Sequence, residues 1–526
     1  MDTKALRQKI LDLAIRGKLV PQDPNDEPAS VLLERIREQK MQMVKEGKLK
    51  AKDITNDTII FVGEDNLHYE KFQDGTVKCI EDEIPFEVPE GWEWARLVSI
   101  CLKVTDGTHH SPDNFPTGEY KYITAKNIKL NGIVLDDITY VTAEVHKEIF
   151  ARCNPEFGDI LYIKDGATSG IATVNTLHEE FSMLSSVALL KPSIGIDNWY
   201  MCYAMQSPYF YNTTRGDMKG VGITRITLNM LTSRLIPIPP QNEQRQISAN
   251  TSKLIELIVS IEKSKDDVLE LIATTKSKIL DLAIRGKLVP QDPNDEPASI
   301  LLERIRAEKE ELIKQGKIKR DKKESVIFKG DDNSYYQQTG DLIESISTWE
   351  LEELPDNWVL CCLGELCDYG NCNNVDADSI AGNAWILDLE DIEKNTGKVL
   401  RKIRKNERDF TSTKHSFYKG QVLYSKLRPY LNKVIIADED GFCTSEILPL
   451  EFANVVLPQY ALYYLMSPTF LRYAKQCSYG VKMPRLGTAD GRKAIFPLPP
   501  IKEQYRIANS ISKCFMQIDN ILSALL

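Results

Sequence analysis

Apolar residues in the centre of the chain recur at alternating intervals of four and three positions. The positions are Ile247, Leu254, Ile258, Ile261, Val268, Ile272, Ile279 and Leu282, with Lys265 and Thr275 filling two places. The same rhythm runs through residues 507–525 and 6–13. Because heptad spacing is typical of a coiled-coil seam, the pattern predicts a long central helix and two terminal helices. A central helix of roughly 38 residues would be about 57 Å long. We expect it to stop at Gly286, and the amino-terminal helix at Gly17.

Two stretches of the chain occur twice. The string KILDLAIRGKLVPQDPNDEPAS stands at Lys9–Ser30 and, unchanged, at Lys278–Ser299, while IPIPPQNEQRQI at Ile236–Ile247 returns as FPLPPIKEQYRI at Phe496–Ile507. In the middle of the chain the PxPPxxEQ element, the helix and the first string follow one another, whereas the ends carry this order cut in two. The sequence therefore predicts a circularly permuted internal repeat: two equivalent units with pseudo-two-fold symmetry, whose heptad seams pack against each other in antiparallel fashion.

Two segments of similar plan lie between the helices, at about Trp92–Leu235 and Trp358–Ala494. Each contains short alternating strands and a strand that runs into a polar or basic loop, as in GDILYIKDGATSG and GQVLYSKLRPYL. A helix-like stretch and a basic glycine-containing loop follow in each. The predicted fold class is α+β, with two mixed α/β domains separated by two long antiparallel coiled-coil helices. Beyond this plan the two segments share little, which suggests that they recognise different things.

Charge along the chain is unevenly distributed. The 526 residues carry a net charge of -10 and the pI is near 5.4, which argues against binding nucleic acid by overall positive field. Residues 401–433 nevertheless hold ten Lys or Arg against Glu407 and Asp409, with aromatic residues interleaved, and residues 472–493 form a second basic stretch. One such run is usually a solvated face, but two runs in matching parts of a duplicated chain favour phosphate contacts.

Cysteine usage and hydropathy indicate a cytoplasmic protein. The 11 cysteines show no paired framework, the amino terminus lacks the features of a signal peptide, and no apolar run is long enough to span a bilayer. The tightest cysteine group lacks the two-residue gaps typical of zinc sites, so buried apolar cysteines are the preferred interpretation over zinc. Its members are Cys361, Cys362, Cys367 and Cys372.

These motifs together resemble the specificity (S) subunit of type I restriction-modification systems. The paired PxPPxxEQ elements, the LAIRGKLVPQ repeats with their PNDEPA extension, and DGTHHSP at Asp106–Pro112 carry the resemblance, which covers nearly the whole chain. It implies two target recognition domains held apart by two antiparallel helices, each domain reading one half of a split, asymmetric DNA sequence. The expected segments are 1–85 and 244–345 as helical repeats with linkers, 86–243 and 346–503 as the recognition domains, and 504–526 as the carboxyl-terminal helix.

The resemblance also implies partners and cofactors. Double-stranded DNA would be the target, two modification (methyltransferase) subunits would methylate adenine N6, and ATP-dependent restriction subunits would cleave. This chain would contribute specificity and bind no cofactor itself. S-adenosylmethionine, ATP and Mg²⁺ would belong to the partner subunits, and no metal or catalytic residue is expected in this chain.

The alternatives are a self-contained nuclease or methyltransferase and a scaffold that binds only proteins. Asn154–Phe157 reads NPEF and lacks the second proline of an adenine-methyltransferase motif, and Gly220–Gly222 has no leading strand. Pro112 and Asp113 followed by Glu119 to Lys121 imitate a PD...ExK nuclease arrangement, but the second segment has no counterpart. No Walker A sequence is present. A pure scaffold would leave the basic aromatic stretches without a purpose.

The residues predicted to contact DNA are those whose side chains suit base edges or phosphates in the loops described above. Arginine and lysine suit guanine, asparagine suits adenine, and further lysines position the backbone. In the first domain the candidates are Thr108, His109, His110, Lys126, Asn127, Lys164, Lys219 and Arg225. In the second domain they are Lys426, Arg428, Tyr430, Lys433, Lys482 and Arg485.

Overall fold

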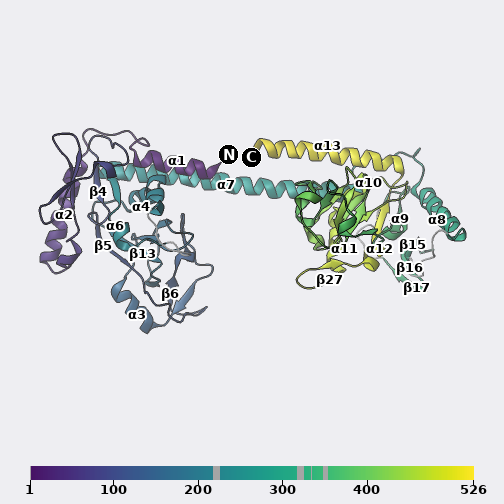
Figure 1. Ribbon diagram of the computed structural model, residues 1–526, viewed down its shortest axis with the longest axis horizontal. Helices are drawn as coiled ribbons and strands as arrows, with labels where there is room; N and C mark the ends of the chain where they lie inside the picture. Colours follow the sequence, from purple (N-terminus) through teal and green to yellow (C-terminus); the bar gives the residue numbers. More distant parts are fainter. Residues whose placement is uncertain (1, 217–224, 317–324, 333, 347–353, 526) are drawn as a thin grey trace. The chain divides into compact units, whose positions relative to one another are not determined.

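The computed structural model describes residues 2–216, 225–316, 325–332, 334–346 and 354–525 (Figure 1). The chain divides into two compact units, Met1–Ser264 and Lys265–Leu526, here called the first and second unit. Each is built from one mixed α/β domain, one small sheet and one pair of long helices. Among the described residues, no helix has the length and apolar character needed to cross a membrane.

Among its described residues, the first unit contains six α-helices and the beginning of a seventh. They are α1 (Thr3–Ile15), α2 (Ala29–Lys45), α3 (Ala143–Arg152), α4 (Asn198–Gln206), α5 (Pro208–Gly216), α6 (Leu228–Thr232) and the first part of α7 (Gln241–Ile284). The strands are β1 (Ile59–Val62), β2 (His68–Lys71), β3 (Val77–Cys79), β4 (Glu93–Arg96), β5 (Cys101–Asp106), β6 (Tyr120–Ile123), β7 (Ile128–Lys129), β8 (Gly132–Ile133), β9 (Thr139–Val141), β10 (Ile160–Ile163), β11 (Ala172–Val174), β12 (Phe181–Met183), β13 (Val187–Pro192) and β14 (Leu235–Ile238).

Two sheets form the mixed domain of the first unit. Four strands pair in the order β11-β10-β13-β5, and three pair in the order β12-β6-β9, with β12 parallel to β6. Strand β10 is buried at every position because one face packs on the cluster around Met201 and the other on the cluster around Phe181. The loop after β10 is therefore presented from a fixed strand.

The second unit follows the same plan. Its helices are the last part of α7, α8 (Ala298–Lys314), α9 (Leu363–Leu366), α10 (Pro458–Leu465), α11 (Pro468–Gln476), α12 (Thr488–Lys493) and α13 (Ile501–Leu525). Its strands are β15 (Ser325–Lys329), β16 (Tyr335–Thr339), β17 (Leu342–Ser345), β18 (Val359–Cys362), β19 (Asn374–Val375), β20 (Trp385–Leu387), β21 (Ile403–Arg404), β22 (Lys414–Phe417), β23 (Val422–Ser425), β24 (Val434–Ile436), β25 (Gly441–Thr444), β26 (Ile447–Leu450), β27 (Ser478–Tyr479), β28 (Arg485–Leu486) and β29 (Ile495–Leu498).

Strand pairing shows which elements of the two units are equivalent. The order β24-β23-β26 repeats β11-β10-β13, and the parallel pair β20/β25 repeats β6/β12. The pair β18/β29 repeats β4/β14. The predicted α+β class and the two mixed domains are therefore confirmed. The helix-like stretches of both domains are each broken in two, at Ser207 and Ser467, because the following proline begins a new helix.

A pair of antiparallel helices borders each domain. In the first unit α1 lies along the start of α7, with Leu11 clustered with Ile255 and Ala14 with Ile247 (Figure 1). In the second unit Lys276 of α7 pairs with Asp519 of α13, and further along the chain Asp295 pairs with Arg506. The antiparallel pairing of heptad helices is confirmed within each unit.

The central helix is longer than predicted, and burial along its seam is uneven. Helix α7 has 44 residues because it begins at Gln241, directly after two prolines, instead of at Ile247. At its seam positions Ile258 is 3% exposed and Ile261 is 38% exposed. Ile255, one place off the seam, is buried because it packs on Tyr203 of α4. The helices thus pack on their own domain as well as on each other.

Both predicted helix ends have the same glycine cap. Gly17 and Gly286 have φ of +64° and +66°. The next N–H groups, of Lys18 and Lys287, donate to the carbonyls of Leu13 and Leu282, both at 2.9 Å. A Cβ on Gly17 would lie 2.3 Å from Pro89 Cγ, and one on Gly286 would lie 2.4 Å from Pro355 Cγ. Glycine is therefore required here both for its backbone angle and for the close approach of a proline.

The PxPPxxEQ elements hold strand, helix and domain together. The Gln244 side chain donates to the Pro239 carbonyl at 2.9 Å and accepts from the Asp197 N–H at 2.8 Å. Gln504 makes the same two bonds, to the Pro499 carbonyl at 3.0 Å and from the Leu457 N–H at 2.8 Å. Burial raises the pKa of Glu243 and of Glu503 above the usual range. These motif residues are structural in both units.

The linkers predicted within 1–85 and 244–345 contain a third repeated element. Strands β1-β2-β3 and β15-β16-β17 form two small antiparallel sheets with equivalent turns. In each turn a tyrosine hydroxyl donates to an aspartate at 2.7 Å, Tyr69 to Asp65 and Tyr336 to Asp332. The sequences IIFVGEDNLHYE and VIFKGDDNSYYQ carry this similarity, since they are identical at six of twelve positions.

Candidate nucleic-acid interface

A lysine ends the buried central strand in each unit. Lys164 follows β10 and its N–H donates to the Ser186 carbonyl at 2.9 Å, while Lys426 follows β23 and its N–H donates to the Glu446 carbonyl at 3.0 Å. The Lys164 carbonyl accepts from the Ile226 N–H, and the Lys426 carbonyl from the Leu486 N–H, both at 3.0 Å. These shared bonds identify the two lysines as equivalent residues.

The same bonds place an arginine beside each lysine. Arg225 forms a β-bridge with Asp165, and Arg485 forms one with Leu427. The structure thus brings together four of the predicted residues as two equivalent pairs, although the members of each pair are about 60 residues apart in sequence. We call Lys164 with Arg225 the first basic pair, and Lys426 with Arg485 the second basic pair.

Two carboxylates organise the first basic pair. The buried side chain of Asp106 accepts a bond of 2.6 Å from Arg152 and lies 3.3 Å from His109 Nε2 and 3.4 Å from Lys164 Nζ. Asp165 lies 3.8 Å from both Lys164 Nζ and Arg225 Nε. Three permanent cations face two carboxylates, so the cluster keeps an excess of positive charge. The side chains of Arg152 and Arg225 are 51% and 62% exposed and can reach a ligand.

The DGTHHSP loop is fixed beside this cluster. The Thr108 N–H donates to the Met183 carbonyl at 2.9 Å, and its hydroxyl donates to the His110 carbonyl at 3.1 Å. His109 and His110 are exposed. Gly107 allows the close approach, because a Cβ there would lie 1.9 Å from the Met183 oxygen. The loop therefore presents both imidazoles from a tightly held backbone.

Two non-glycine residues beside the second basic pair have left-handed backbones. Arg428 has φ +49° where the first unit has Gly166 at +86°, and Asn432 also has φ +49°. The conformation costs roughly 1–2 kcal/mol for each non-glycine residue. The Arg428 N–H donates to the Pro484 carbonyl at 2.7 Å, which helps to hold this geometry. Such strain is concentrated at functional sites, and Tyr430 between these residues is 51% exposed.

A carboxylate also accompanies the second basic pair. The Arg485 guanidinium binds Glu446 with Nη2–Oε1 at 2.9 Å and Nε–Oε2 at 3.1 Å. Lys482 lies exposed in the loop between β27 and β28. No ion pair joins Lys426 to any other residue that the structure describes. Its positive charge is therefore available to an anionic ligand.

The remaining predicted residues are placed differently. Lys126 is exposed in the turn after β6, whereas Asn127 is 2% exposed and its amide bonds the Thr124 N–H and the Val134 carbonyl. Lys433 points inward, where its ammonium donates to the Leu389 carbonyl and burial lowers its pKa. Lys219 lies outside the described residues. Asn127 and Lys433 therefore serve the fold, and we leave them out of the surface proposed below.

The excess positive charge predicted for residues 401–433 is largely neutralised by ion pairs in the folded chain. Its basic residues pair with acidic residues outside the counted stretch. Arg401, Arg408 and Lys414 bind the group Asp388, Glu390 and Asp391, while Lys402 and Arg404 bind Asp438 and Glu439. Burial alone would raise the pKa of Asp391, but hydrogen bonds from Arg408, the Asp388 N–H and Arg401 hold it below its usual value. Five of these cations are therefore engaged by carboxylates of the same unit.

Sequence reasoning missed the partners of the basic pairs. Arg152 on α3 and Glu446 after β25 are far in sequence from the predicted lysines and arginines that they accompany, while Asp165 directly follows Lys164. Asp106 begins the DGTHHSP motif. Its position one residue before Gly107, at the end of β5, is the signal that could have marked it as the centre of the cluster.

The catalytic alternatives gain no support from the geometry. In NPEF, Asn154 accepts from Lys103 Nζ at 2.9 Å, and in the nuclease-like pattern Lys121 pairs with Glu179 at 2.6 Å. No group of three His, Cys, Asp or Glu in the described parts of the chain could hold a metal ion. Cys361, Cys362 and Cys367 are buried, and burial raises the pKa of Cys361 and Cys367. The cysteines therefore behave as apolar core residues.

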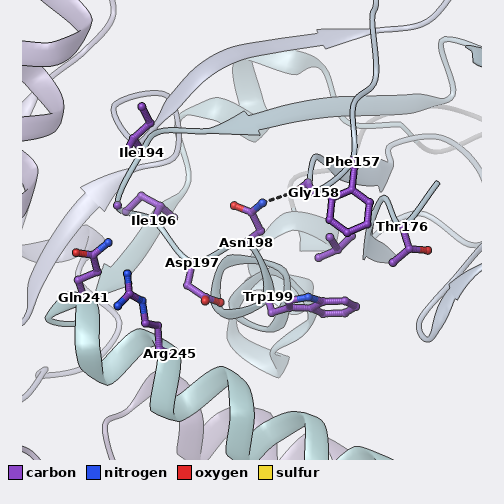
Figure 2. A pocket seen from close by; sticks show the side chains of 12 residues that line it. Phe157, Gly158, Thr176, Ile194, Ile196, Asp197, Asn198, Trp199, Gln241 and Arg245 are labelled. Carbon is purple, nitrogen blue, oxygen red and sulfur yellow. Dashed lines mark hydrogen bonds between the residues drawn. The ribbon is translucent and has the colours of Figure 1, made fainter. Parts of the chain in front are cut away.

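The first unit also contains a cavity of about 510 Å³, away from the basic pair. Figure 2 shows Phe157 and Trp199 on one side of it and Gln241 and Arg245 of α7 on the other. The Asn198 amide donates to the Gly158 carbonyl at 2.6 Å across its floor. None of the predicted DNA-contacting residues lines this cavity.

Two equivalent basic pairs on one duplicated scaffold place the chain in a class of internally repeated α+β proteins that carry a matching cationic pair in each unit. The sequence matches the family described as "Type I restriction modification DNA specificity domain" over residues 89–271 and 355–523. It is 31% identical over 414 residues to the Type I restriction enzyme EcoEI specificity subunit of Escherichia coli, and 30% identical over 417 residues to the EcoAI specificity subunit of that species. These alignments cover 69% and 70% of this chain.

The chain therefore belongs to the type I restriction-modification DNA specificity family. It spans 61% and 63% of the length of the two curated relatives. One chain from a solved structure of the type I R-M system is similar with a TM-score of 0.52 at 16% identity, covering 84% of this chain and 94% of that one. This likeness shows a shared fold.

Proposed function

We propose that this chain is the DNA sequence-specificity subunit of a type I restriction-modification complex. Residues 86–243 and 346–503 would be its two target recognition domains, each reading one half of a bipartite, asymmetric target. The observation that carries the proposal is the recurrence of a basic pair at the end of the same buried strand in both units. Because the loops around the two pairs differ, the two half-sites would differ in sequence.

The proposed DNA-contacting surface combines each basic pair with polar side chains of the same domain. In the first pair Lys164 is 8% exposed, so Arg152 and Arg225 present most of the exposed charge there. Arg152, which the sequence did not suggest, joins the first domain because its half-exposed guanidinium lies in the same cluster as Lys164. The set in the first domain is Thr108, His109, His110, Lys126, Arg152, Lys164 and Arg225. The set in the second domain is Lys426, Arg428, Tyr430, Lys482 and Arg485.

Partner subunits would supply the chemistry. We propose that two modification subunits bind the chain and transfer the methyl group of S-adenosylmethionine to adenine, and that restriction subunits use ATP and Mg²⁺ to cleave unmodified DNA. The chain itself would act in the cytoplasm without a reaction of its own. Its contribution would be to bind the target bases and position them for the partners.

The test of this function is single-molecule sequencing for N6-methyladenine in cells that express the chain with its modification subunit. We expect a split motif that disappears when only this chain is removed, which would give both half-sites and the spacer at once. A complex that assembles without producing any new methylated motif would contradict the proposal.

Lys426 of the second basic pair and the neighbouring Arg428 support a more specific prediction. Replacing Lys426 and Arg428 by alanine should weaken DNA binding by the complex roughly 10- to 100-fold and reduce the slope of log affinity against log salt by about two, because two phosphate-directed cations are lost. Assembly with the modification subunit should be unchanged. Filter binding between 50 and 200 mM salt measures this.

The matched control is Lys402→Ala. Lys402 lies in the same basic stretch but pairs with Asp438 at 2.7 Å, so its charge is already neutralised within the fold. We expect its loss to change DNA affinity less than threefold. Equal weakening by both variants would mean that the stretch acts as a diffuse positive field and that Lys426 and Arg428 make no particular contact.

A further inference from the structure

A short hairpin beside the second basic pair exposes apolar side chains. Strands β27 and β28 pair Ser478 with Leu486 and Tyr479 with Arg485, leaving residues 480–484 as a loop. In this loop Val481 is 101% exposed and Met483 is 49% exposed, and Tyr479 at its base is 62% exposed. Several exposed apolar side chains in one place mark a surface that is covered by a partner.

The base of this hairpin is firmly held. The Arg428 N–H donates to the Pro484 carbonyl at 2.7 Å, and the Leu486 N–H donates to the Lys426 carbonyl at 3.0 Å. Leu486 is 1% exposed, so its side chain is anchored in the core. Gly480, with φ +97°, supplies the backbone angle that starts the loop. The apolar tip is therefore presented by a fixed stem.

The charges around the tip favour a polyanionic partner over a protein. Lys482 stands in the tip between Val481 and Met483, and Lys426 and Arg428 form the base. Two acidic groups lie at the base of this region: the Glu446 carboxylate, which Arg485 engages in two bonds, and the Asp490 carboxylate beside Gly487. An apolar loop tip surrounded by cationic side chains is complementary to a DNA groove, in which phosphates flank the stacked bases.

We propose that the tip of this hairpin, residues 480–484, enters a groove of the DNA half-site and inserts Val481 and Met483 against a base step, partly unstacking it. Apolar side chains inserted in this way kink the duplex, and the cost of unstacking is offset by the wider contact that the bent DNA allows. The second domain would then select its half-site partly by how easily the sequence deforms. This inference rests on the proposed function and adds the way in which one domain reads its target.

The test uses the complex of the full chain with its modification subunit and duplexes carrying the methylated motif found in vivo. 2-Aminopurine replaces one base at a time in the half-site of the second domain, leaving the methylated adenine unsubstituted because methyltransferases flip their target base. We expect fluorescence to rise several-fold at one step when the wild-type complex binds. The variant Val481→Ser with Met483→Ser should lose most of this rise and bind the motif about tenfold more weakly.

Lys482→Ala is the matched control in the same loop. It removes a cation but keeps both apolar side chains, so we expect the full fluorescence rise, with a salt slope reduced by about one. This outcome, together with the loss in the serine variant, supports insertion. A wild-type complex that binds its motif without any rise, or an undiminished rise in the serine variant, overturns it.

Two further outcomes distinguish a failure of the insertion from a failure of the proposed function. If the serine variant releases the modification subunit in size-exclusion chromatography, the tip is a protein contact and insertion is overturned. If the wild-type complex binds no duplex with sequence preference, the proposed function fails, and insertion fails with it. The binding isotherm of the wild-type complex distinguishes this failure from a failure of insertion alone.

Discussion

Replacement of Gly107 by alanine is expected to disable the first recognition domain. The new Cβ would lie 1.9 Å from the Met183 oxygen and 2.3 Å from its carbonyl carbon, so two backbone segments must separate by about 1.5 Å to reach ordinary contact. Forced overpacking of this kind costs about 3 kcal/mol. The movement would also pull the Thr108 N–H from the Met183 carbonyl and shift the histidines that follow.

The functional effect of Gly107→Ala should be large. Losing one or two base contacts corresponds to roughly 10- to 100-fold lower DNA affinity. Thermal unfolding measures the stability change, and binding of the complex to its methylated motif measures the affinity. Gly216→Ala in the same unit is the control, because a Cβ there meets nothing within 4 Å, and its stability should change by less than about 0.5 kcal/mol. Wild-type affinity in Gly107→Ala would remove the DGTHHSP loop from the interface.

Replacement of Lys40 by methionine should release the small sheet of the first unit. Lys40 on α2 is 1% exposed and its ammonium pairs with Asp57, before β1, at 2.6 Å, while also donating to the Val98 carbonyl at 3.1 Å. It thus joins three segments. Removing one member of a buried pair costs about 3–5 kcal/mol because the other charge stays buried without compensation. Hydrogen exchange of the amides in residues 59–79 reports this loss directly.

The pKa of Asp57 also predicts how the destabilisation caused by Lys40→Met changes with pH. Burial raises the pKa of Asp57 from its usual value to about 6, although attraction and a hydrogen bond from Lys40 lower it. Because the folded chain holds this proton more tightly than the unfolded chain, the contribution to stability is greatest below about pH 4 and falls as pH rises to about 6. Lys40→Met raises the pKa of Asp57 further. Its destabilisation should therefore be larger at pH 8 than at pH 5, where the carboxyl can be neutral.

The double variant Lys40→Met with Asp57→Leu is the control for that experiment. Replacing both members of a buried ion pair by apolar residues of similar volume is often neutral or stabilising. We expect near wild-type protection of the β1–β3 amides and no added pH dependence. If Lys40→Met alone leaves their exchange unchanged at pH 8, the pair does not hold the sheet in place.

Much of the fold could be predicted because its elements leave periodic or repeated traces. The heptad rhythm identified the helix pairs, and the glycine followed by proline identified where they end. The start of α7 was placed six residues late because the prediction began at the first seam residue, Ile247, whereas the helix begins after Pro240. The small sheets are not predicted because the matching segments are only about twelve residues long, although they share six residues, among them Asp65 and Asp332, which make the same bonds.

The site was only partly predictable, because charge pairing is decided in three dimensions. A count along the sequence cannot tell that Asp388 and Asp391 neutralise Arg408, or that Lys433 turns inward. The lysines and arginines that do meet, such as Lys164 and Arg225, come from separate elements joined by backbone bonds between strands and loops. Selection by residue type predicted the members of these pairs. The same selection also picked Asn127, whose amide is buried and serves the fold.

The identical glycine caps have a consequence for how such a protein can change over generations. Gly17 and Gly286 meet the same kind of proline, and the glutamines that follow, Gln22 and Gln291, bond the same glycine carbonyl and the same motif glutamate. Under the proposed function, a genetic crossover within either copy of this stretch would transfer a complete recognition domain and keep these glutamine contacts at its border. New target specificities would then be inherited one half-site at a time.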